Sequence, residues 1–352
     1  MKSTVQLSTL ASMRDALTAL PLHFDVSTQL HTLVRLGLDK LPLPAQGATL
    51  QRWQALALVA GHSLSLAKLY EGHTDALAIL AQLGECNVAA ESATASDGAS
   101  WGVWAAESAS TRVTITPSSG TAVQLDGTKC WCSGAQTLSH GLLTAWYADG
   151  RGPQLVSVAM HQAGINVSCE GWHAVGMVAS ASVDVNFSQA QAQLVGKPRD
   201  YMARPGFWHG GAGIAACWYG GARFLGQALH QVLRDLPPEA RGALRLAALG
   251  KVDLALHSTA AVLREAAQWI DDNPLVDARA TALRARLAAE DCAKQVLDEA
   301  GRALGAAAFC RNARFARAAA DLPVFVRQSH ADRDSTALAE STLLRGDTPW
   351  LL

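Results

Sequence analysis

The sequence predicts an α+β protein with helices at both ends and strands in the middle. Apolar residues recur every three or four positions in the first part of the chain, which is the period of an amphipathic helix. In the middle, short runs rich in Val, Thr and Trp alternate with Gly, Ser, Asp and Pro, as strands and turns do. The last part is rich in Ala, Leu and Arg and again has the helical period. We therefore expect an N-terminal helical domain (1–99), a central antiparallel β-domain of barrel or sandwich type (100–200) and a C-terminal four-helix bundle (201–352).

The composition agrees with a globular chain of more than one domain. Of its 352 residues, 49% are hydrophobic and 17% charged, which supports a large core and excludes wholesale disorder. The net charge is −1 and no Lys/Arg run stands out, which argues against a nucleic-acid surface. No apolar run approaches a membrane span, and no signal peptide is recognisable. Seven scattered Cys residues without a C-x-x-C pair indicate reduced thiols and a cytoplasmic location.

The helical segments are delimited by Pro and Gly. Pro42, Pro44 and Gly47 divide the N-terminal segment into one pair of helices and then a longer pair. After the β-domain, the breaks at Pro237-Pro238 and at 271–274 leave four helices, which we expect to pack as an antiparallel bundle that also forms the subunit interface. Their expected ranges are 212–234, 242–271, 277–307 and 311–328. Between the two helical parts we expect seven or eight strands, among them 102–106, 112–116, 142–147, 154–160 and 182–187.

One strand, near residues 125–134, carries the most informative residues. Asp126-Gly127 is a hairpin signal, because Gly accepts the positive φ of such a turn. Side chains alternate along a strand, so Trp131 and Ser133 should share one face, where a flat aromatic and a hydroxyl would steady a planar ring. A Trp packed in a β core is the alternative, and the segment alone favours it. Cys130 and Cys132 would share the opposite face, and two thiols are too few for a zinc site.

The same segment resembles the G-x-K-x-W-I-[TS]-[NS]-G strand of the acyl-CoA dehydrogenase family of flavoproteins, with matches at Gly127, Lys129, Trp131, Ser133 and Gly134. The resemblance implies the helix–strand–helix fold and a flavin, FAD or alternatively FMN. It also implies that Trp131 and Ser133 contact the flavin ring, Ser133 near N5. The resemblance further implies a homodimer or homotetramer that acts on a small acyl substrate. We expect neither a nucleic-acid partner nor a membrane span.

Weaker matches extend the resemblance from Leu33 to Arg333. The run 171–177 with Ser180 and Ser182 resembles a strand turn of the family, and 210–222 resembles the start of its first long C-terminal helix. Ala303-Leu304-Gly305 resembles the turn that holds the dinucleotide part of FAD, which implies a cofactor role for Arg302 and Gly305. Arg311 is a further candidate for the pyrophosphate, because guanidinium suits phosphate. An ion pair with Glu299 is the plain alternative for Arg302.

The usual catalytic base is missing. Counting from Gly305, Asp321 falls at the Asp of the family's R-D-A segment and Ser329 at its catalytic Glu, and no Glu lies within ten residues of Ser329. The second family location for the base, 213–235, contains no Glu either. The family's T-E-P-x-x-G-S-D loop is shortened to 106–110.

Two other places in the sequence offer titratable side chains. His330, beside Asp332, is the candidate catalytic base, since His titrates near neutral pH; a solvated helix end is the alternative. Glu71 and His73 form a second titratable pair, for which the alternative is a helix end at Gly72.

Three functions follow from the resemblance and its departures. The first is an FAD-dependent oxidoreductase acting on the CH–CH group of an acyl thioester or a related substrate. The second is a flavin-dependent monooxygenase on the same scaffold, for which a missing Glu is expected. The third is a redox-inactive binding or structural homologue, which the Trp131 and Ser133 pair argues against.

Overall fold

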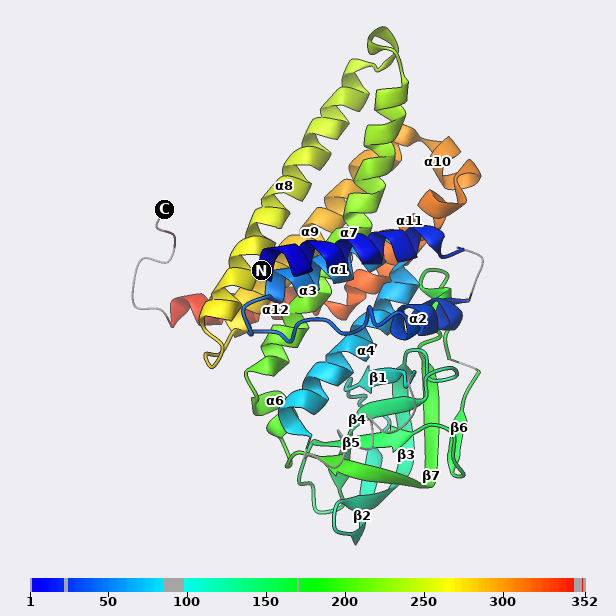
Figure 1. Cartoon of the computed structure of the whole chain (residues 1–352), viewed down its shortest axis with the longest axis vertical. Coiled ribbons are helices and arrows are strands. Elements are labelled where there is room, and N and C mark those ends of the chain that lie inside the picture. The colour runs from blue at the N-terminus through cyan, green and yellow to red at the C-terminus, as the bar shows by residue number, and fades with distance from the viewer. Residues whose placement is uncertain (1, 22–24, 85–97, 170, 345–349, 351–352) are drawn as a thin grey trace.

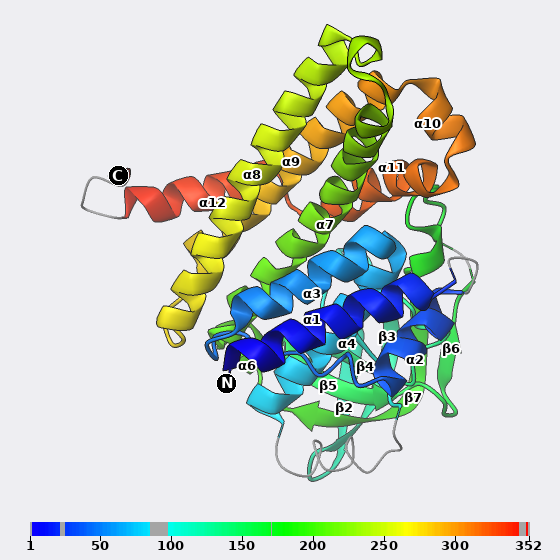
Figure 2. The same cartoon turned by 45° about the horizontal axis from the view of Figure 1, so that its top comes forward.

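A β-barrel and a bundle of long helices form the two ends of the molecule, and the N-terminal helices lie between them (Figures 1 and 2). The computed structural model describes residues 2–21, 25–84, 98–169, 171–344 and 350. One hydrophobic core runs through all three parts of the chain. The helix–strand–helix order expected from the sequence is confirmed. The division into domains at residues 99 and 200 stays a prediction.

Within the described residues four helices precede the barrel, as one pair and then a longer pair. They are α1 (Lys2–Ala19), α2 (Val26–Arg35), α3 (Thr49–His62) and α4 (Leu64–Leu83). Asp25 caps α2 by accepting from the Thr28 amide at 2.9 Å, and Ser63 caps α4 by accepting from the Leu66 amide at 3.2 Å. Ser63 is extended, with φ −155° and ψ 127°, so the chain turns sharply between α3 and α4.

Helix α4 is the central element of the molecule. It packs against α2 and α3, the barrel strand β1, and the bundle helices α7 and α11. Its Tyr70 hydroxyl donates to the Leu38 carbonyl at 2.5 Å. The imidazole of His73 accepts from the Trp101 amide through Nδ1 at 3.2 Å, so Nε2 carries the proton and donates to Asp39 at 3.1 Å. These bonds connect α4 to the N-terminal loop and to the barrel.

The helix end that was considered at Gly72 does not exist, because α4 continues to Leu83. Buried apolar side chains on both sides of Gly72, such as Leu69 and Ile79, outweigh the helix penalty of about 1 kcal/mol for a single Gly. Glu71 and His73 do not bond to each other. Glu71 is bonded to Lys68 at 3.4 Å, whereas His73 is bonded to Asp39.

Seven strands form the β-domain. They are β1 (Trp101–Trp104), β2 (Val113–Ser119), β3 (Ala122–Cys132), β4 (His140–Tyr147), β5 (Gln154–Ala159), β6 (Ile165–Val167) and β7 (Val183–Val195). Hydrogen bonding follows the order β4–β2–β3–β7–β5 and returns from β5 to β4, which closes a barrel. The strand β1 adds to β4, and β6 adds to β7. The pairings β1–β4 and β2–β4 are parallel and the others antiparallel, so the sheet is not antiparallel throughout.

Helices account for the rest of the described chain. They are α6 (Asp200–Ala203), α7 (Gly206–Asp235), α8 (Ala243–Asp272), α9 (Arg279–Leu304), α10 (Ala306–Arg311), α11 (Ala313–Phe325) and α12 (Asp332–Leu343). The long helices α7, α8 and α9 pack against one another. The fourth helix of the expected bundle, α11, packs against α7, α9 and α4. It therefore joins the bundle to the N-terminal helices.

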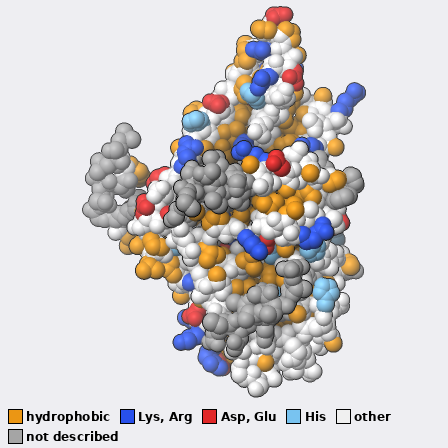
Figure 3. All heavy atoms as spheres, viewed as in Figure 1, with side chains coloured by type: hydrophobic (Ala, Val, Ile, Leu, Met, Phe, Trp, Pro, Cys, Tyr) orange, Lys and Arg blue, Asp and Glu red, His pale blue; other side chains and the backbone are white. Residues whose placement is uncertain are grey.

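Helix α8 has an apolar surface. Leu244, Leu246 and Leu254 are 88%, 48% and 66% exposed, and hydrophobic side chains are visible over the bundle in Figure 3. Within the described residues, α8 is the one helix long and apolar enough to cross a membrane by length and composition. Helix α8 packs on α7 and α9 along part of its surface.

Candidate functional site

The end of β3 is irregular at Trp131. This residue has a left-handed backbone (φ 57°), and the pairing with β7 shifts between Lys129 and Cys132. Trp131 is consequently 53% exposed, whereas Cys132 is fully buried. The strand ends at Cys132, so Ser133 lies beyond it. Simple alternation, from which we expected Trp131 and Ser133 to share a strand face, does not hold through this bulge.

Three serine hydroxyls form a buried chain beside Trp131. The Ser133 Oγ lies 2.7 Å from Ser182 Oγ, which in turn lies 3.1 Å from Ser180 Oγ. The Ser180 hydroxyl donates to the Met177 carbonyl at 2.8 Å, and the Gly134 amide donates to the Ser180 carbonyl at 2.8 Å. The two sequence motifs that contain Ser133 and Ser180 are thus joined in space.

The turn before these serines is held by α11. The Met177 amide donates to Asp321 Oδ1 at 2.6 Å, and burial raises the pKa of this carboxyl. A Cβ at Gly176 would overlap the Ala320 carbonyl oxygen, so only glycine allows this approach. Asp321, recognised in the sequence by its motif position, therefore acts as a clamp between the bundle and the barrel.

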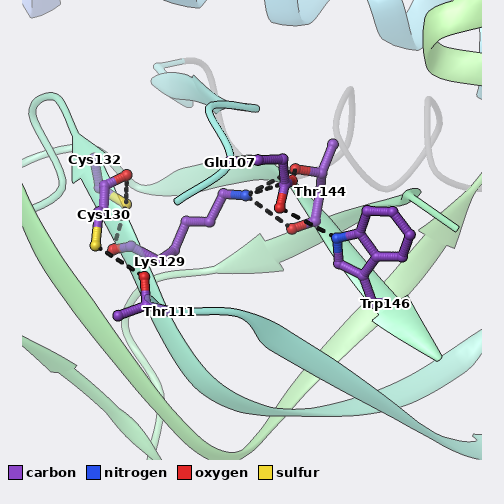
Figure 4. Close-up of polar contacts among 7 residues, drawn as sticks. All are labelled: Glu107, Thr111, Lys129, Cys130, Cys132, Thr144 and Trp146. Carbon is purple, nitrogen blue, oxygen red and sulfur yellow. Dashed lines mark hydrogen bonds and ion pairs between the residues drawn. The ribbon is translucent and has the colours of Figure 1, made fainter. Parts of the chain in front are cut away.

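A buried lysine anchors the loop that follows β1 (Figure 4). The Lys129 ammonium donates to Glu107 Oε1 at 3.0 Å, to the Thr144 hydroxyl at 2.8 Å and to the Thr144 carbonyl at 3.1 Å. Glu107 also accepts from the Thr144 hydroxyl and, at 3.2 Å, from the Trp146 indole. Burial lowers the pKa of Lys129, and Glu107 opposes this effect. The shortened loop 106–110 is therefore tied to β3, two residues before Trp131.

The predicted dinucleotide residues lie elsewhere in the chain. Gly305, with φ 63°, lies between α9 and α10, which Figures 1 and 2 show in the helical bundle. Arg302 is 64% exposed and pairs with Asp298 at 2.8 Å and with Glu299 at 3.0 Å. No hydrogen bond or ion pair in the described structure joins these residues to Trp131 or Ser133. A cavity of about 840 Å³ lies beside this turn, lined by Leu304, Arg311 and residues of α7.

The candidate base His330 is exposed at the start of α12. Its side chain is 63% exposed, and Nδ1 lies 3.6 Å from Asp334 Oδ1. Its amide donates to Asp334 Oδ2 at 3.2 Å. Asp332 lies in the first turn of α12 and is exposed, as expected for a solvated helix end. A catalytic role for His330 stays a prediction.

The residue that sequence analysis missed is Glu290 on α9. Ser329, at the position of the lost catalytic Glu, is a neighbour of this carboxylate, which is 2% exposed. Burial would raise the pKa of Glu290, but Lys294 and Ser329 favour the charged form more strongly, and the pKa lies below its usual value. Lys294 and Arg327 pair with it at 2.7 and 3.4 Å. Spacing along the chain gives no signal for this contact, because Glu290 belongs to a different helix.

Burial raises the pKa of a second carboxyl, that of Glu71, and the neighbouring Lys68 partly offsets this effect.

The six Cys residues in the described part of the chain form no disulfide. No group of three or more His, Cys, Asp or Glu side chains among the described residues could hold a metal ion.

Solved flavoenzyme structures share this fold. TdsC from Paenibacillus sp. A11-2, a dibenzothiophene monooxygenase determined with FMN and indole, matches with a TM-score of 0.79 and 18% identity over 99% of this chain and 97% of TdsC. KijD3, in complex with FMN and a dTDP-linked amino sugar, matches with a TM-score of 0.81 and 19% identity over 98% of this chain and 94% of KijD3. A Tcur3481-Tcur3483 steroid ACAD matches with a TM-score of 0.77 and 16% identity over 97% of this chain and 98% of that one.

At these identities the likeness establishes the fold, which is that of the acyl-CoA dehydrogenases. No family model matches the sequence, and no curated protein does.

The anchor at Lys129 leads to a prediction about stability. Glu107→Ala should lower the free energy of unfolding by roughly 1–3 kcal/mol, less than a fully buried pair would lose, because Glu107 is partly exposed. Lys129→Met should cost less, since it removes the buried charge and leaves a carboxylate that water can reach. Urea unfolding measures both, with the exposed Glu340→Ala as control. A larger loss for Lys129→Met than for Glu107→Ala would contradict this account.

Proposed function

We propose that this chain is a flavin-dependent oxidoreductase whose flavin ring, of FAD or FMN, is held at the end of β3. The acyl-CoA dehydrogenase fold supports the proposal, as do the FMN-containing structures of TdsC and KijD3. The observation that carries it is the exposed Trp131 at the end of β3, two residues before Ser133, whose hydroxyl belongs to the buried serine chain. A bound flavin would supply the redox chemistry, which no side chain provides.

The residues at the end of β3 fit a planar, partly polar ring. Val175 and Val178, near Ser180, are 85% and 52% exposed. Each of them, like Trp131, exposes apolar surface that a bound group could cover. Ser133 is hydrogen-bonded within the serine chain, so its orientation is set before anything binds. The clamp at Asp321 and the anchor at Lys129 hold the two flanking segments.

Of the two flavin reactions, we propose monooxygenation. The position of the dehydrogenase base holds Ser329, and TdsC, which shares the fold, is a monooxygenase. Oxidation of an acyl thioester at its CH–CH group is the second candidate. It is favoured by the buried, charged Glu290 beside Ser329, which could serve as the missing base. A cytoplasmic location and a small-molecule substrate belong to both proposals.

We propose that the chain forms a homodimer or homotetramer through the bundle. The reason is the exposed apolar surface of α8 at Leu244 and Leu254, which we call the apolar stripe. Exposed Leu244 and Leu254 cost free energy unless a second subunit covers them.

The flavin site is tested with Trp131→Ala. Loss of the aromatic surface should raise the dissociation constant for FMN or FAD by about tenfold, whereas circular dichroism should show a folded barrel. Fluorescence titration measures the affinity. Trp350→Ala, which removes an indole that is 83% exposed, is the matched control and should leave the affinity unchanged. Equal flavin affinity of Trp131→Ala and wild type would exclude this placement.

The missing base predicts weak dehydrogenase activity. General-base catalysis contributes roughly 10²–10⁴-fold, so flavin-loaded protein mixed with a straight-chain acyl-CoA should bleach slowly or not at all. If bleaching does occur, His330→Ala and Glu290→Gln identify the base, and the essential one should abolish bleaching while flavin stays bound. Rapid bleaching that survives both substitutions would rule out the weak activity predicted here and both candidate bases. A colourless protein that does not bind added flavin would instead support the redox-inactive homologue.

The subunit interface is tested by sedimentation at micromolar concentration. Leu254→Glu should dissociate the oligomer, because it places a charge in the apolar stripe of α8. Leu343→Glu on α12, where the leucine is 85% exposed, is the control and should leave the mass unchanged. A monomeric wild-type protein would refute the interface.

A further inference from the structure

A second groove lies between the barrel and α11, beyond the serine chain. It encloses about 470 Å³ and is walled by the loop after β3 at Gly134, the turn at Ala181, the starts of α2 and α4, and α11. We call it the α11 groove. Its apolar wall includes Leu64, Leu69 and Phe224. Gly134 and Asp321, which belong to sequence motifs, border it, whereas no motif includes its two arginines, Arg314 and Arg317.

Two guanidinium groups line this groove without a close ion pair in the described structure. Arg314 and Arg317 lie three residues apart on α11, and both are exposed. Within the described part of the chain neither forms an ion pair, and Arg314 stacks over the Phe224 ring at 5.0 Å. Guanidinium donors in this state are available to an anion that enters the groove.

The two carboxylates of the groove are already occupied. Asp25 accepts from the Thr28 amide at 2.9 Å and from its hydroxyl at 2.6 Å. Asp321 accepts from the Met177 amide. These donors are uncharged, so they do not neutralise the carboxylates, and Arg317 acts electrostatically on Asp321. Neither Arg314 nor Arg317 forms an ion pair within the described residues, so their guanidinium donors are available to a ligand.

Backbone donors add to the two guanidiniums. The helices α2, α4 and α11 all begin in the wall of the groove. At the start of α2, Asp25 accepts from the Ser27 and Thr28 amides. At the starts of α4 and α11 the caps bind the third amide, so the amides of the first two residues have no acceptor within their own helix. Such amides, at the positive end of a helix dipole, bind phosphate in many proteins.

His62 supplies a further polar atom. Its Nε2 is buried and has no hydrogen-bond partner within the described residues. Burial and the neighbouring Arg314 lower its pKa to about 4, so the ring is neutral near pH 7. A neutral imidazole can donate to or accept from a ligand.

We propose that the α11 groove is a phosphate-binding site, with Arg314 and Arg317 as its charged anchors. The apolar wall would take the organic part of a phosphate ester. Phosphate could come from a flavin mononucleotide whose ring lies at Trp131, since Gly134 borders the groove, or from a separate phosphorylated ligand. The site itself does not depend on the proposed flavin function.

In the test, flavin-free protein is titrated with inorganic phosphate as the probe, and calorimetry measures the binding. Wild type should bind phosphate saturably in the millimolar range, and more weakly as salt is added. Arg314→Gln and Arg317→Gln should each weaken binding by about tenfold. The exposed Arg245→Gln, at the start of α8, is the control and should bind as wild type does. No binding by folded wild type, or equal binding by the α11 variants, would overturn the proposal.

The source of the phosphate is separated by adding flavins. If FMN displaces phosphate and riboflavin does not, the groove holds the cofactor's own phosphate. If phosphate still binds FMN-loaded protein, a separate phosphorylated ligand is the occupant. If the protein binds no flavin, the proposed function is refuted. The phosphate titration then still shows whether the α11 groove binds phosphate.

Discussion

The burial of α4 between the barrel and the bundle is the constraint on which the rest of the structure depends. A helix that meets other elements on nearly all sides cannot shift without moving them, because protein interiors are close-packed. Two buried polar side chains specify its position further. Tyr70 and His73 need hydrogen-bond partners once they leave water, and only one placement supplies Leu38, Asp39 and the Trp101 amide together.

The candidate site is assembled where segments from different parts of the chain meet. The turn at Met177 is fixed by Asp321 from α11, and the loop at Glu107 is fixed by Lys129 from β3. Along the chain, Trp131 lies between Lys129 and Ser133, and Ser133 is linked through Ser182 and Ser180 to the turn at Met177. A ligand bound there would find a surface whose neighbours are already positioned, so little conformational entropy would be lost on binding. The same logic holds for the α11 groove, whose walls belong to the starts of three helices.

Much of the architecture could be predicted because periodicity and Gly/Pro breaks report local structure. The order of helices and strands follows from them, and the motif position of Asp321 pointed to a residue that proved structural. The features that the sequence did not predict depend on long-range contacts. The bulge at Trp131 arises from pairing with β7, and the continuation of α4 through Gly72 arises from burial on both sides. The approach of Glu290 to Ser329 and the grouping of Arg314 with two distant helix starts have no local signature at all.

The closure of the barrel has a consequence for how this chain behaves in a crowded solution. A strand with one unpaired side is a template on which another chain can add, and such edges promote aggregation. Here β5 pairs with both β4 and β7, so the ring leaves no long edge. Among the described strands, only β1, with 4 residues, and β6, with 3, extend beyond it. Strands this short offer few backbone groups to an incoming chain, which protects the β-domain from strand exchange between molecules.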